Sequence, residues 1–312
     1  MKRSRAKEAD AHAVTELLDA FRKKLLKARP SLPSSRCISR STLIELALEA
    51  RESASLPVLR KCSGSKLISL MEEAAVVQPI PLESDDFKTK AHLYSVGFGV
   101  ADIAIPPAEM LQAHVPNGIA CYFTAIELHG LSTQPSPQYH IATLRTPKTK
   151  LGAPRPRTHA SADRPLPLGV LQFCTGGIPC YLTQRDPANL IGVQRRQLNP
   201  YCVVRLTTLE QTLLDCLHRP QSAGGAAVIF EAWEQGLKRT TPKKVMQLAE
   251  KIGDEVLLRR ASFMIERFAP DAHVLDEAKR LIGQIEPERD IPSLLPGIAF
   301  RHVDSVWGLR TP

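Results

Sequence analysis

The chain has 312 residues, enough for one large or two medium domains, and 43% of them are hydrophobic, as is typical of a globular protein. No run approaches the roughly eighteen apolar residues of a membrane span, and no apolar stretch follows the basic N-terminus, so neither a spanning helix nor a secretory signal is expected. Seven cysteines without a C-x-x-C pair predict reduced thiols, a cytoplasmic protein and no zinc site.

The formal net charge of +9 is unevenly placed along the chain. Residues 1–40 hold eleven Lys or Arg and four acids, residues 143–219 hold the same numbers again, and residues 41–142 carry a net negative charge. Two separate basic blocks suggest contact with a polyanion by more than one region. A solubilising surface charge is the alternative.

The first 35 residues are predicted to form a basic helix and a linker. Apolar side chains recur at helical spacing between residues 11 and 27, and Lys and Arg crowd the last turns, where cations suit the helix dipole. Pro30 and Pro33 then end the helix.

Residues 36–105 are predicted to form a winged helix-turn-helix domain that binds DNA. Short helices are expected over residues 42–51, 56–61 and 65–74, and strands over 76–82 and 91–98, joined by the charged loop ESDDFKTK. In such a domain the third helix enters the major groove and the hairpin, or wing, contacts the DNA backbone.

The DNA contacts are assigned to cationic and hydroxyl side chains, because cations neutralise phosphates and short polar side chains reach base edges. They are Arg60, Lys61, Ser63, Ser65, Lys66 and Ser69 at the third helix, Lys88 and Lys90 in the wing loop, and Arg36 and Arg40 before the first helix. A solvated helix face is the alternative. Acidic residues at 72, 73, 85 and 86 oppose DNA, so the contact surface must be narrow.

Residues 106–312 are predicted to form a larger mixed α/β domain that ends largely helical. Strands are expected over 139–145, 168–173, 190–194 and 201–206, helices over 207–218, 223–236, 242–252, 255–268 and 272–285, and a last strand near 306–310. Residues 146–167, rich in Pro, Arg and Lys, are expected to be an exposed loop. The basic residues from Arg145 to Arg196, Arg185 among them, could also form a phosphate track or a docking surface.

The most patterned segment is residues 206–225, which begin with a predicted capping box between Thr207 and Glu210. Gly224-Gly225 supplies a turn that tolerates positive φ. Asp215 is given a structural role, with a neighbouring backbone group or an arginine such as Arg205 as its partner. No set of residues suggests catalysis, a metal or a cofactor.

Two motifs carry a resemblance to a known family. One is LTTLEQTLLDCLHRPQSAGG at 206–225, an E-x-T-L-L-D helix followed by P-x-x-x-G-G, and the other is YFTAIELHGLSTQ at 122–134. Together with Leu93-Tyr94-Ser95-Val96-Gly97 at the close of the hairpin, they resemble the antitoxins of the AbiEi type. These are the transcription-regulator halves of bacterial abortive-infection toxin–antitoxin pairs.

The resemblance implies an α+β protein that represses its own operon and is not an enzyme. It implies double-stranded operator DNA with inverted repeats, bound by two copies of the chain, which could form a homodimer on the DNA. It also implies a C-terminal domain that gives immunity to a nucleotidyltransferase toxin without a stable complex.

Two other classes of function remain open. The chain could be a plain transcriptional regulator whose C-terminal domain senses a ligand or a protein. A nucleic-acid-processing enzyme is the weaker alternative, because the residues supply no acid–base or metal constellation.

Overall fold

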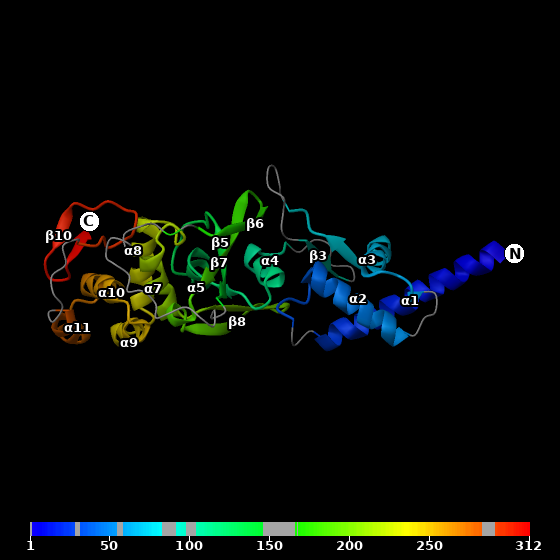
Figure 1. Cartoon of the computed structure of the whole chain (residues 1–312), viewed down its shortest axis with the longest axis horizontal. Coiled ribbons are helices and arrows are strands. Elements are labelled where there is room, and N and C mark those ends of the chain that lie inside the picture. The colour runs from blue at the N-terminus through cyan, green and yellow to red at the C-terminus, as the bar shows by residue number, and fades with distance from the viewer. Residues whose placement is uncertain are drawn as a thin grey trace, which may run out of the picture. The chain divides into compact units, whose positions relative to one another are not determined.

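The structure is a computed structural model of the chain (Figure 1), and it describes residues 2–28, 32–54, 59–82, 92–97, 104–145, 166, 168–282 and 291–312. The expected α+β class is confirmed, since the described residues form helices and three separate sheets. No helix in these ranges is long and apolar enough to cross a membrane. The chain divides into two compact units. Unit 1 is Met1–Asn117 with Gln172–Gly177 and Arg196–Val204, and unit 2 is Gly118–Leu171, Ile178–Arg195 and Arg205–Pro312.

The first six elements of unit 1 follow the order helix, strand, helix, helix, strand, strand, and a further helix comes after them. Its elements are α1 (Lys2–Ala28), β1 (Cys37–Ser39), α2 (Arg40–Ala54), α3 (Gly64–Glu73), β2 (Val77–Pro79), β3 (Leu93–Val96) and α4 (Pro107–His114). The strands form an antiparallel sheet in the order β1-β3-β2. In the central strand, Tyr94 pairs with Ile38 and Val96 pairs with Val77.

The core of unit 1 joins α1, α2 and α3. Leu17 and Phe21 of α1, Leu43 of α2, and Leu67 and Met71 of α3 are all fully buried in one cluster. The sequence had suggested a separate segment over residues 1–35. The structure instead places α1 in the same core, because its apolar stripe packs along α2.

The N-terminal elements differ from the prediction at two other points. Strand β1 was not expected; its three residues are too few to show a strand period, and it exists because it pairs with β3. Of the helix expected over 56–61, residues 56–58 lie outside the described ranges, while Leu59 is buried and residues 60–61 form a turn. The strands β2 and β3 are shorter than expected.

The six-stranded sheet has the order β6-β7-β5-β4-β9-β8. These strands are β4 (Ile119–Ala120), β5 (Tyr139–Leu144), β6 (Val170–Thr175), β7 (Ile178–Arg185), β8 (Val193–Asn199) and β9 (Cys202–Thr207). Residues 172–177 and 196–204, at the turn ends of two hairpins, are assigned to unit 1. Within unit 2, β5 runs parallel to β7, and β4 is antiparallel to β5 and parallel to β9.

Helix α5 (Phe123–His129) follows β4 and ends at a glycine. Gly130 adopts the left-handed conformation with φ 64°, and Leu131 N–H donates to the carbonyl of Ile126. The turn at Gly224-Gly225 also has the expected positive φ values, 92° and 87°. At Gly224 a side chain is excluded by space as well, because a Cβ would lie 2.6 Å from the Phe123 ring.

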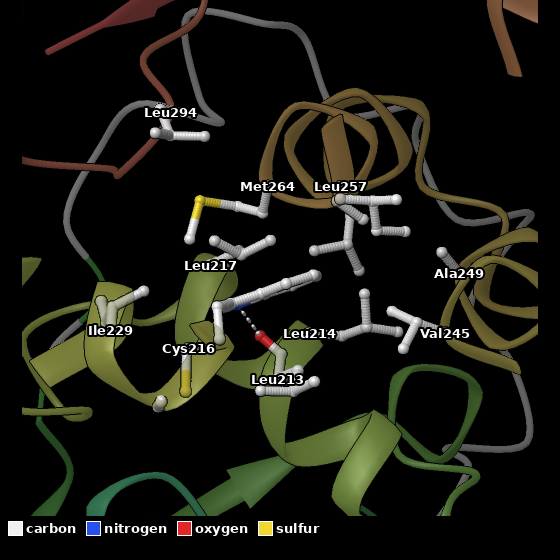
Figure 2. Packing of buried hydrophobic residues seen from close by; sticks show 14 of the residues in the cluster. Leu213, Leu214, Cys216, Leu217, Ile229, Val245, Ala249, Leu257, Met264 and Leu294 are labelled. Carbon is white, nitrogen blue, oxygen red and sulfur yellow. Dashed lines mark hydrogen bonds between the residues drawn. The ribbon is translucent and has the colours of Figure 1, made fainter. Parts of the chain in front are cut away.

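The rest of unit 2 is largely helical. It contains the short 3-10 helix η2 (Pro187–Asn189), the helices α7 (Leu209–His218), α8 (Ala226–Leu237), α9 (Pro242–Ile252), α10 (Glu255–Phe268) and α11 (Val274–Ile282), and the hairpin β10 (His302–Asp304) and β11 (Leu309–Thr311). Figure 2 shows its core, in which leucines of α7 face side chains of α8, α9 and α10. Trp233 is fully buried there and donates from Nε1 to the carbonyl of Leu213 at 3.0 Å.

The cap of α7 lies one residue beyond the predicted position. Thr208, not Thr207, is the N-cap and accepts from the backbone N–H of Gln211. Glu210 accepts a hydrogen bond from the hydroxyl of Thr240 instead of closing a capping box. Thr207 and Thr208 both fit the local sequence pattern of an N-cap. Thr207 is 0% exposed, and this burial leaves Thr208 as the cap.

Asp215 has a structural role, as expected, but its partner is Arg185. The two side chains form a bidentate ion pair with N–O distances of 2.5 and 2.7 Å, and they are 4% and 1% exposed. Gln211 donates a further hydrogen bond to the Asp215 carboxylate at 2.9 Å. Arg185 is therefore not part of a surface phosphate track.

Candidate nucleic-acid interface

Helix α3 presents one polar face and one buried face. Ser63 caps its first turn by accepting from the backbone N–H of Lys66 at 3.3 Å. Leu67, Ile68 and Met71 are buried, which fixes the rotation of the helix. Among the predicted contact residues, Ser63, Ser65 and Lys66 are therefore exposed, and Ser69 is partly exposed.

Arg40, the first residue of α2, lies beside this polar face. Its Nη2 donates to the Ser65 hydroxyl at 2.9 Å, which ties the N-termini of α2 and α3 together. Arg40 also lies near Tyr94 on β3. Burial raises the pKa of Tyr94, the charge and hydrogen bond of Glu72 add to the rise, and Arg40 opposes it.

Arg60 and Lys61 are exposed in the turn that leads into α3. The backbone of this turn is held by Arg51 of α2, whose Nη1 donates to the carbonyls of Arg60 and Cys62 at 3.4 and 2.9 Å. The structure thus brings six predicted cationic or hydroxyl residues around the N-terminal half of α3. These are Arg40, Arg60, Lys61, Ser63, Ser65 and Lys66.

The opposite end of α3 is acidic. Glu72 is partly exposed and Glu73 is exposed, both in its last turn. Helix α3 thus has basic side chains at its N-terminus, where the helix dipole is also positive, and acidic side chains at its C-terminus. The predicted contact residues therefore surround the N-terminal half of α3, and the acidic residues lie at its other end.

Arg36 does not belong to this surface, which corrects its assignment as a DNA contact. Its Nε and Nη2 donate to the two oxygens of Glu109 at 3.1 and 2.9 Å, and its guanidinium lies 5.3 Å from the Tyr201 ring centroid. Glu109 also accepts from Ser34 and Asn199. Burial opposes ionisation of Glu109, but these donors outweigh it and lower the pKa of Glu109.

Sequence reasoning missed the Glu109 network because Glu109 and Arg36 are 73 positions apart. Lys88 and Lys90, the predicted wing contacts, lie outside the described residues, as do residues 146–165 of the basic loop. In the part of the chain that is described, no group of three or more His, Cys, Asp or Glu side chains could hold a metal ion.

No family model and no curated protein matches this chain. Among solved structures it is similar to the crystal structure of the RV2827C protein from Mycobacterium tuberculosis. The two share 10% sequence identity with a TM-score of 0.51, and the match covers 88% of this chain and 85% of the other. At this identity the similarity concerns the fold alone.

Proposed function

We propose that unit 1 is a winged helix-turn-helix that binds double-stranded operator DNA through α3. The order helix, strand, helix, helix, strand, strand, with the sheet order β1-β3-β2, is the arrangement such a domain requires. Helix α3 has ten residues, so it is about 15 Å long. A helix of this size fits a major groove roughly 12 Å wide.

The observation that carries the proposal is the exposed, cationic N-terminal half of α3. Lys66 extends from the helix itself, and Arg60 and Lys61 precede it in a turn held by Arg51. Lys66 can donate to a guanine edge or a phosphate, while Arg60 and Lys61 neutralise phosphates. Ser65 and Ser69 are short enough to let the helix backbone approach the bases.

We further propose that the chain is a cytoplasmic antitoxin that represses its own operon. This part rests on the resemblance of residues 122–134 and 206–225 to AbiEi-type antitoxins. Two copies would bind an inverted repeat and could form a homodimer on the DNA. The C-terminal domain would give immunity to a nucleotidyltransferase toxin without a stable complex, and without catalysis of its own.

The DNA half is tested by titrating the purified protein into a labelled duplex from upstream of its own coding sequence. Lys66→Glu is expected to weaken binding at least about tenfold at roughly 150 mM salt, because it reverses a charge that faces phosphate. Lys251→Glu on α9 is the matched control: it changes the charge equally at an exposed lysine of unit 2. Equal affinities for the two variants would show that α3 does not read DNA.

The antitoxin half is tested by expressing the neighbouring toxin gene from a foreign promoter. Rescue of growth by the wild-type chain, and also by Lys66→Glu, is expected if immunity resides in the C-terminal domain. A regulator without an antitoxin role would fail to rescue, because it acts only by silencing the native promoter.

A further inference from the structure

Unit 1 contains a cavity that DNA binding does not use. It has a volume of about 620 Å³ and is lined by the last turns of α1, by β2 and the residues after it, by the end of β3 and by Met110 of α4. Sites for small molecules commonly have volumes of about 300–1,000 Å³. The cavity is therefore large enough for a ligand rather than a few water molecules.

One wall of the cavity is apolar and partly uncovered. Leu25, Val96 and Met110 are buried, whereas Leu26, the next residue of α1, is 53% exposed. Ile80, after β2, also lines the cavity. An apolar ligand body would remove the exposed face of Leu26 from water, which favours binding.

Another wall of the cavity carries a cation. Arg36 lines the cavity, and its Nε and Nη2 are bonded to Glu109. Its Nη1 has no hydrogen-bond partner among the residues that the structure describes. Because Glu109 fixes the guanidinium, Nη1 is held in place for an acceptor. Arg22 of α1 adds a second cation to the lining.

We propose that this cavity binds a small organic anion. The apolar body of the ligand would lie against Leu25 and Leu26, and its carboxylate or sulfonate would accept hydrogen bonds from Arg36 Nη1. A guanidinium matches such oxyanions in charge and geometry.

A regulatory role follows, and this part rests on the proposed function. The cavity is lined by β2, which comes directly after α3, and Val76 N–H donates to the carbonyl of Met71 within that connection. A ligand between α1 and β2 thus contacts the elements that position α3. By thermodynamic reciprocity, DNA must change ligand affinity by the same factor as the ligand changes DNA affinity.

The binding site is tested with two probes, the anion anilinonaphthalene sulfonate and the neutral N-phenylnaphthylamine, titrated into the full chain and followed by fluorescence. The sulfonate is expected to bind more tightly than the neutral probe. Leu26→Glu should weaken sulfonate binding at least about tenfold, through like-charge repulsion, and the neutral probe much less. Val306→Glu is the control, because Val306 is 51% exposed in the β10–β11 hairpin of unit 2.

The results of this titration either support or overturn the proposed anion site. The site is supported if Leu26→Glu alone weakens the anion while its circular dichroism matches that of wild type. It is overturned if neither probe binds, if both variants bind alike, or if the two probes are equally affected. This titration contains no DNA, so it stands even if operator binding fails. Repeating the operator titration with saturating sulfonate then tests regulation, and an unchanged DNA affinity would overturn that role.

Discussion

Each unit of this protein buries a polar cluster, and the two clusters differ in how they are satisfied. In unit 1, Glu109 is fully buried and accepts four hydrogen bonds, from Ser34, Asn199 and, twice, Arg36. In unit 2, Tyr122 and His140 are equally buried and contact each other edge to face, with ring centroids 5.5 Å apart. The Tyr122 hydroxyl and both His140 ring nitrogens have no hydrogen-bond partner in the described part of the chain.

The unit 2 cluster is also strained. Tyr122 links β4 to α5 with φ 53° and ψ −130°, a backbone conformation that costs a non-glycine residue about 1–3 kcal/mol. Guanidinium groups of Arg185 and Arg219 lie 5.4 and 5.6 Å from the centre of its ring. Packing and these charges hold the residue in place, whereas hydrogen bonds hold Glu109. Burial alone therefore does not reveal whether a polar group stabilises its fold.

The largest change in stability is expected from a substitution that disrupts the hydrogen-bonded Glu109 cluster. Glu109→Gln should destabilise unit 1 by about 3 kcal/mol, because it leaves the Arg36 charge uncompensated and gives an amide N–H₂ to groups that themselves donate. Urea unfolding followed by circular dichroism measures this loss. Glu73→Gln, an exposed glutamate of α3, is the control and should change stability little. A loss below about 1 kcal/mol would mean that the Glu109 network contributes little to the stability of unit 1.

The second prediction uses pH to separate the clusters. Burial, and then the charge of Arg219, lowers the pKa of His140 from 6.5 to about 3. The unfolded chain therefore takes up a proton on this residue at a pH where the folded chain does not. Above the unfolded pKa of 6.5, His140 does not reduce the free energy of unfolding. As the pH drops from 6.5 toward 3, this residue lowers the free energy of unfolding by about 1.4 kcal/mol per pH unit. The lowered pKa of Glu109 affects stability only below about 4.5.

His140→Phe keeps the ring stacked on Tyr181 and removes the titrating nitrogens. Between pH 6.5 and 4.5, the unfolding free energy of this variant should depend less steeply on pH than that of wild type. The difference in slope should correspond to about one proton. Fluorescence of Trp233 and Trp307, both in unit 2, reports this transition. Identical slopes for wild type and variant would place His140 in a solvated environment.

The smallest expected effect is at Tyr122. Tyr122→Phe removes a buried hydroxyl that has no described partner, so the stability of unit 2 should stay the same or rise by about 1 kcal/mol. Tyr139→Phe is the matched control, because the Tyr139 hydroxyl donates to Glu127 at 3.1 Å and its loss should destabilise the unit. If Tyr122→Phe destabilised unit 2 as much as the control, the Tyr122 hydroxyl would stabilise its fold, as the Glu109 carboxylate does.

Much of the fold was predictable because its signals are local. Ser63 before an apolar helical face gave α3, and the glycine after the short helix at 123–129 gave its left-handed end. The polar face of α3 was predictable for the same reason, since burial of Leu67 and Met71 determines which residues are exposed. The candidate residues Ser65 and Lys66 therefore lie on the exposed face of α3, whereas the contact of Arg40 with Ser65, 25 positions away, is tertiary.

The α+β class and most of the helices follow from local sequence patterns, because apolar spacing and capping residues act within a few positions. The partners of charged groups, in contrast, are known only from the folded chain: Arg36 pairs with Glu109 across 73 positions, and Arg185 pairs with Asp215 across 30. Strand β1 and the place of α1 in the core were decided in the same way. The physical reason is that a charge or a strand edge can pair with many candidates, and only the folded chain selects the one within reach.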